Sequence, residues 1–200
     1  NTISFNYTVA DGHNSDDLDY VATTSLVLNN GTITDPTTGT NATLDLPLVG
    51  GANSIAGQNA LIVDTIKPTV ELVSSSKEDG SYSAGDVIPI IIDFDENIEV
   101  TGTPTITLEA GDTDPAVGYT SGTTNDSLLF NYTVSAGENS TDLDYVGTTS
   151  LALSGGSIAD PAGNDATLTL AAPSAANSLG ANKALIIDTV APTVEFVTST

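Results

Sequence analysis

The sequence predicts an all-β fold built from repeated β-sandwich units. Apolar and polar residues alternate over short stretches, which is the pattern of a strand with one buried face. Clusters of Gly, Asp, Asn and Pro separate these stretches and supply turns. No stretch shows a sustained helical period with capping residues. A chain of 200 residues that is 39% hydrophobic is large enough to fill ordinary cores.

The chain contains a close internal repeat. The stretch "FNYTV" begins at Phe5 and again at Phe130, an offset of 125 residues. The stretch "ALIVDT" at Ala60 recurs as "ALIIDT" at Ala184, an offset of 124 residues, because segment 36–42 carries one extra residue. The repeat unit is therefore about 124 residues long.

This period divides the chain into three expected segments. Residues 1–64 correspond to the C-terminal half of one repeat. Residues 65–188 form one complete repeat, and residues 189–200 correspond to the first strand of the next. Because the first segment is only half of a unit, we interpret the chain as a window cut from a longer repetitive polypeptide.

Within the complete repeat, two stretches have an apolar row on one face of a strand. These rows are Ile88, Ile90, Ile92 and Phe94 in one stretch, and Leu128, Phe130, Tyr132 and Val134 in the other. Further strands are predicted at 70–74, 105–109, 117–120, 150–153, 166–170 and 184–187. Seven or more short strands in one unit of this length predict an immunoglobulin-like β-sandwich with Greek-key connections.

A tyrosine follows a turn at the same place in both copies. The sequence "DLDYV" contains Tyr20 in the first copy and Tyr145 in the second. This is the position of the tyrosine corner, in which the hydroxyl group hydrogen-bonds to the backbone at a sandwich crossover. We therefore expect both tyrosines to be structural.

The succession "DTIKPTVELVSSS", "AGDVIPIIIDFDENIEVTGTPTITLEAG" and "LDYVGTTSLALSGGSIADPAGNDATLTL" resembles the bacterial immunoglobulin-like repeats found in tandem in large cell-surface adhesins. The resemblance covers essentially the whole chain. It implies an extracellular module that serves as a stalk, spacer, assembly unit or ligand binder. The first copy departs from the pattern at "DPTTGTN", residues 35–41, so no ligand role is carried over to that loop.

Oxygen-rich segments are expected to meet at one pole of the complete repeat. Strands that alternate in direction place the incoming linker, a loop in "DFDENIEV" and the loop in "SIADPAGNDAT" at the same end. Calcium prefers six to eight oxygen ligands, so we expect an interdomain calcium site there. The candidate ligands are Asp64, Asp95, Glu96, Asp160, Asn164 and Asp165, with Asp188 repeating the role of Asp64 in the next linker.

An alternative remains open for this pole. Asp, Asn and Gly also populate turns for conformational reasons, and the sequence has no EF-hand spacing and no calcium-binding nonapeptide. The pair Asp142 and Asp144, which recurs as Asp17 and Asp19, has a spacing compatible with metal binding. We interpret this pair as turn-forming.

Net charge and composition exclude several function classes. The chain has 26 acidic residues, three lysines and no arginine, a formal net charge of −23, which disfavours nucleic acids and anionic membrane surfaces as partners. It has no apolar run long enough for a membrane helix.

The chain offers few residues for catalysis. It has no Cys, and its one histidine, His13, corresponds to Glu138 in the other copy, so we interpret this position as surface. The complete repeat has no histidine for a catalytic triad, and we expect no enzyme activity.

The leading hypothesis is a structural or adhesive module that extends a stalk or fibre from a cell surface. Its expected partners are neighbouring repeats, other copies in a fibre, and an unidentified surface or glycan. Two alternatives remain: a subunit of a strand-complemented extracellular filament, and a glycan-binding or surface-binding module of a secreted protein.

Overall fold

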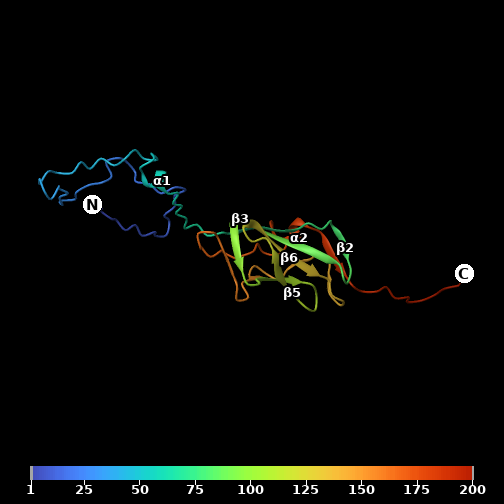
Figure 1. Cartoon of the computed structure of the whole chain (residues 1–200). Helices are drawn as coiled ribbons and strands as arrows, with labels where there is room; N and C mark the ends of the chain where they lie inside the picture. Colours follow the sequence, from blue (N-terminus) through green and yellow to red (C-terminus); the bar gives the residue numbers. More distant parts are fainter. Residues whose placement is uncertain (1, 200) are drawn as a thin grey trace. The chain divides into compact units, whose positions relative to one another are not determined.

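The computed structural model describes residues 2–199, and the chain divides into two compact units between Ile66 and Lys67. Residues 1 and 200, the ends of the first and last predicted segments, lie outside the described residues. The second unit contains the strands and is mainly β (Figure 1). The all-β fold class predicted from the alternating pattern is confirmed at this level.

The second unit contains an eight-stranded sheet in which every pairing is antiparallel. The main path runs β1-β3-β6-β5-β4-β8, while β10 pairs with β3 and β9 pairs with β4. Its strands are β1 (Val70–Ser75), β3 (Val87–Thr101), β4 (Thr105–Glu109), β5 (Ala116–Ser121), β6 (Asn125–Thr133), β8 (Asp144–Tyr145), β9 (Leu151–Ala152) and β10 (Ser157–Ala159).

A smaller, three-stranded sheet has the order β2-β11-β7. The strands β2 (Gly80–Tyr82) and β11 (Leu185–Asp188) are parallel, and β7 (Asn139–Ser140) is antiparallel to β11. The short helix α2 (Leu179–Asn182) precedes β11. The Ser178 hydroxyl caps this helix by accepting the Ala181 N–H at 3.2 Å.

The pairing of β3 with β6 places the two predicted apolar rows side by side. Ile88 stands opposite Tyr132, and Ile90 stands opposite Phe130. All eight residues of the two rows are buried, so the predicted orientation of both strands is confirmed. They belong to one apolar cluster that also includes Leu185 and Ile187 of the smaller sheet.

The strand β3 is longer than predicted. We expected a loop within residues 93–100, but β3 continues to Thr101 through an irregularity in its pairing with β6. The register passes from Asp93 opposite Ser127 to Ile98 opposite Asn125, so extra β3 residues bulge between these two pairs. Ile98 is fully buried beyond the bulge, and its burial favours a continued strand over an exposed loop.

The predicted strand at 166–170 contains one isolated bridge, from Thr167 to Thr69. A second bridge, from Asp165 to Ala159, lies just before it. The Thr167 N–H donates to the Pro68 carbonyl at 2.8 Å. Pro68 has no N–H to donate, so a regular ladder does not extend along this segment.

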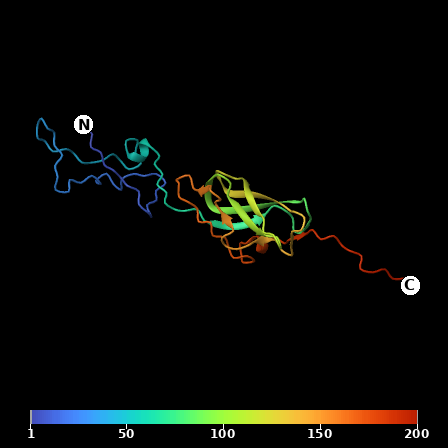
Figure 2. The same cartoon turned by 90° about the horizontal axis from the view of Figure 1, so that it is seen from below.

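The first unit has little regular structure within the described residues. Its one helix is α1 (Ile55–Gln58), and isolated bridges join Ser15 to Val63 and Thr34 to Asn41. Figure 2 shows these residues, in blue to cyan, as mostly irregular backbone with one short helix. Among the described residues of the whole chain, every helix is too short to cross a membrane.

Candidate metal centre

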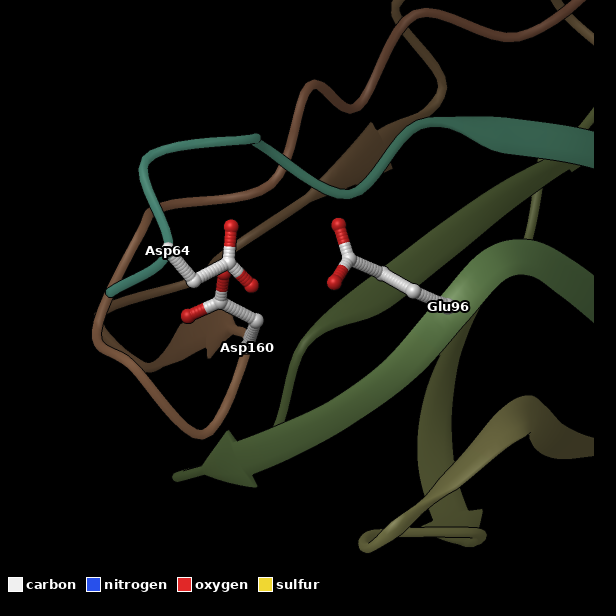
Figure 3. Close-up of side chains that lie close together, drawn as sticks. All are labelled: Asp64, Glu96 and Asp160. Carbon is white, nitrogen blue, oxygen red and sulfur yellow. The ribbon is translucent and has the colours of Figure 1, made fainter. Parts of the chain in front are cut away.

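Three carboxylates converge from the segment before β1, from β3 and from the loop after β10. Asp64, Glu96 and Asp160 each offer an oxygen within 4.8 Å of the other two, and their side chains point toward a common space (Figure 3). They form the one such group of three or more His, Cys, Asp or Glu side chains among residues 2–199. We call these three residues the carboxylate triad.

Asp160 is held in place by the loop that follows β10. Its Oδ1 accepts the Asn164 backbone N–H at 2.8 Å, and its Oδ2 accepts the Asn164 side-chain amide at 2.7 Å. The turn closes through a hydrogen bond from the Gly163 N–H to the Asp160 carbonyl, with Gly163 at φ +92°. This left-handed conformation suits glycine. Asp160 is 2% exposed, so the loop holds a buried carboxyl group at the pole.

Glu96 and Asp64 reach the triad from different directions. Glu96 lies in the bulge of β3, and the extra residues there aim its side chain away from the regular ladder. Asp64 lies in the segment that leads into β1, and its Oδ1 accepts the Ile66 N–H at 2.9 Å. Both side chains are half-buried.

The spacing of the triad suits a divalent cation. Calcium lies about 2.3–2.6 Å from each oxygen ligand, so two ligands on opposite sides of the ion are about 5 Å apart. Oxygens that lie within 4.8 Å of one another can therefore share one ion. Three close carboxylates repel each other, and a cation between them removes that repulsion.

The remaining predicted ligands lie around the triad or away from it. Asn164 is bonded to Asp160, so it supports the triad's buried member. Asp165 is exposed and lies on the bridge to Ala159. Asp188 is exposed at the end of β11, and its Oδ1 accepts the Val190 N–H at 3.0 Å. This is the same hydrogen bond that Asp64 accepts from Ile66.

Asp95 is tied to the backbone beside β1. Its two carboxylate oxygens accept the Thr69 N–H and the Thr69 hydroxyl, each at 2.7 Å. Partial burial raises the pKa of Asp95, but these hydrogen bonds stabilise the charged form and hold the pKa below its ordinary value. Asp95 thus fixes the segment entering β1, next to the triad.

One member of each repeated Asp pair, Asp144 or Asp19, joins loop segments. Asp144 is buried, and its oxygens accept the N–H of Tyr145 at 2.9 Å and of Ser174 at 2.8 Å. Asp19 makes the corresponding contacts with Tyr20 and Gly50, both at 2.9 Å. Two chain segments are joined in each copy.

The tyrosines of "DLDYV" also have matching structural contacts. The Tyr145 hydroxyl donates to the Ala171 carbonyl at 2.7 Å, and the Tyr20 hydroxyl donates to the Pro47 carbonyl at 2.6 Å. Burial and the neighbouring Asp144 charge raise the pKa of Tyr145 to about 12. The structural role expected for both residues is confirmed, but the expected tyrosine corner is not: the acceptors lie 26 and 27 residues downstream, whereas a tyrosine corner bonds a few residues upstream.

The burial of one carboxylate, that of Glu138, was not predicted from the sequence. Glu138 is 7% exposed and accepts the Tyr132 hydroxyl at 2.8 Å, so the surface interpretation of this position is wrong for Glu138. Burial and this glutamate raise the pKa of Tyr132. In the first copy, the Tyr7 hydroxyl instead meets the His13 Nδ1 at 2.8 Å, and His13 is exposed as expected. A tyrosine stands six residues before this position in both copies, and that spacing was the sequence signal for a polar partner of the tyrosine hydroxyl.

Comparison of the chain with models of protein families, with curated proteins and with solved structures finds no match.

Proposed function

We propose that the chain is a structural module of an extracellular stalk or fibre, built of tandem immunoglobulin-like β-sandwiches and stabilised by calcium. The single observation that carries the calcium role is the convergence of Asp64, Glu96 and Asp160. These residues come from the incoming segment, the β3 bulge and the loop after β10, so one ion would tie three separate segments together.

The sandwich interpretation is supported by the core. The eight-stranded and three-stranded sheets contribute to a single apolar cluster. The period of about 124 residues supports the stalk, because repetition sets length without adding a new kind of site.

The acidic composition supports divalent cations rather than polyanions as partners. A net charge of −23 repels phosphate backbones and anionic lipid surfaces. Tyr82 and Tyr119 are half-buried, and their hydroxyls bond to the backbone of Glu78 and Thr123, which disfavours these two rings as a stacking platform for a sugar.

The calcium role is tested by thermal unfolding of the full chain in a chelator and in calcium at about 100 times its dissociation constant. Binding to the folded state alone then adds about 2.7 kcal/mol of stability. We expect the second unit's unfolding midpoint to rise by several degrees. Magnesium and sodium chloride at matched ionic strength should give a much smaller rise.

Three variants locate the effect. Asp64→Asn and Glu96→Gln should abolish most of the calcium-dependent rise, because each removes one charged ligand. Asp188→Asn is the matched control: it changes the same kind of linker carboxylate, with the same backbone hydrogen bond, outside the triad. An equal rise with magnesium, or equal loss in Asp188→Asn, would show that the carboxylates act only as a charged surface.

A further inference from the structure

The first unit exposes the apolar residues that the second unit buries. We call residues 2–63 the half copy, residues 65–125 the front half and residues 126–188 the back half. Phe5 and Tyr7 are 75% and 53% exposed in the half copy. Their counterparts Phe130 and Tyr132 are 0% and 1% exposed in the back half. The same sequence pattern thus has opposite burial in the two copies.

The half copy nevertheless follows the path of the back half. The Leu18 N–H donates to the Leu61 carbonyl at 2.8 Å, and the Leu143 N–H donates to the Leu185 carbonyl at 2.7 Å. The bridge between Ser15 and Val63 has its equivalent between Ser140 and Ile187. Together with the matching Asp and Tyr contacts, these bonds give the half copy the backbone course of a back half.

A cavity of about 600 Å³ lies in the half copy where the second unit has its core. Its apolar lining includes Phe5, Tyr20, Leu26, Leu46 and Ile55. The corresponding residues of the second unit are all buried in the apolar cluster: Phe130, Tyr145, Leu151, Leu170 and Leu179. Native cores are close-packed, so a hollow this large marks missing partner atoms.

The second unit shows which elements supply those partner atoms. The strand β3 places Ile90 opposite Phe130, and β5 places Tyr119 against the Phe130 ring with centroids 6.1 Å apart. The strand β1 binds the loop around α2: the Val73 N–H donates to the Asn177 carbonyl and the Asn182 side-chain amide donates to the Val73 carbonyl, both at 2.9 Å. All of these partners belong to the front half.

We propose that the exposed face of the half copy is the docking surface for one occupant, the front half of a further copy of this repeat. The inference depends on neither calcium nor adhesion. Packing of β1-, β3- and β5-type strands would fill the cavity and bury the row that begins with Phe5 and Tyr7. The half copy is then the preformed half of a second sandwich.

The tail of the chain is a weaker occupant. Residues 189–199 have the pattern of β1 and its approach, and Val194, Phe196 and Val197 are exposed. The tail has no counterpart of β3, whose Ile90 covers Phe130 in the second unit. It would leave most of the cavity unfilled.

The test is a fusion in which a second copy of residues 65–125 directly precedes residue 1 of the full chain. Amide hydrogen exchange is measured by mass spectrometry in a chelator, so that the calcium proposal cannot influence the outcome. We expect exchange in peptides from residues 5–63 to slow by about 100-fold or more, because a cooperative core forms around them. Exchange in residues 126–188 should stay unchanged and reports that the second unit is folded.

The matched control is the same fusion with Ile88→Asp and Ile90→Asp in the added copy alone. This control keeps the length of the added segment and its peptide link to residue 1, but it removes the apolar row of the added β3 strand. Amides in residues 5–63 should therefore exchange as fast as they do in the unfused chain. Equal protection by both fusions, or none by the unaltered fusion, would overturn the proposal. The proposal would also be overturned if the unfused chain sedimented as a dimer and its residues 5–63 were already protected from exchange. A second copy of the chain would then cover the exposed face of the half copy.

Discussion

The half copy and the back half differ in burial far more than in local hydrogen bonding. Asp19 and Asp144 accept equivalent backbone N–H groups, yet Phe5 is exposed and Phe130 is buried. The hydrogen bonds of the turns, of the helix caps and of the Asp side chains join residues within one half of the repeat. They therefore form in the half copy as well as in the back half. Burial of the apolar row depends on strands supplied from outside that half. Local polar contacts therefore fix the chain path, and long-range strand pairing decides stability.

The largest expected effect is the difference between Phe130→Ala and Phe5→Ala. Phe130 is fully buried, and its truncation should destabilise the second unit by about 3–5 kcal/mol. Phe5 is mostly exposed, and its truncation should change stability by less than about 0.5 kcal/mol. Urea unfolding followed by circular dichroism measures both. A comparable loss in Phe5→Ala would mean that its face is covered in solution.

The next largest expected effect is the difference in stability loss between Asp144→Ala and Asp19→Ala, the equivalent substitutions in the two copies. Asp144→Ala removes the acceptor of two backbone N–H groups beside the core and should cost about 2–3 kcal/mol. Asp19→Ala acts in a more exposed setting and should cost less than Asp144→Ala does. Asp142→Ala is the control, since Asp142 is exposed. If Asp142→Ala proved as damaging as Asp144→Ala, the pair would act as one unit, as a shared ligand would require.

A smaller effect concerns Tyr145 at alkaline pH. The pKa of Tyr145 is raised from 10.0 to about 12, so the folded state holds this proton more tightly than the unfolded state. Its contribution to stability is complete below pH 10 and is lost as the pH rises toward 12. Tyr145→Phe should cost about 1 kcal/mol at neutral pH and flatten the alkaline decline. Urea unfolding at a series of pH values, with Tyr20→Phe for comparison, measures this, and an unchanged slope in Tyr145→Phe would contradict it.

The smallest effect concerns Asp95, in the front half that the half copy does not match. Its pKa is lowered by the Thr69 hydrogen bonds despite partial burial, so its contribution is present above the unfolded-state pKa of about 4 and is lost as the pH falls through the folded-state value. Asp95→Asn should cost only a small part of a buried hydrogen bond's worth at pH 7, because the side chain is exposed and solvent screens its charge, and nothing in strong acid. Thermal unfolding at both pH values tests this. A deficit that persists in acid would indicate a steric rather than an electrostatic cause.

The sequence located most strands because the alternation of side chains along a strand is a local property. The rows that contain Ile90 and Phe130 were identified in this way. The end of β3 was missed because its bulge breaks the alternation before Ile98 is buried. The segment 166–170 was overpredicted because its neighbour, at Pro68, cannot continue a ladder.

The sequence predicted which segments meet at the candidate metal centre, but it did not predict which of their acidic residues come together. Asp64, Glu96 and Asp160 were among the candidate ligands, and the structure brings these three together. Asp95, adjacent to Glu96, instead binds Thr69. Adjacent residues in a bulged strand point in different directions, and the sequence does not specify the bulge geometry that chooses between them.

The sequence by itself determined the alternating rows, the turns, the acidic character and the repeat of about 124 residues. These depend on residue type and spacing alone. Only the tertiary structure decided that Glu138 is buried while His13 is exposed, and that Phe130 is covered while Phe5 is not. Burial is a relation between segments far apart in the chain, and two nearly identical stretches differ in it when only one has the partner strands that exclude water.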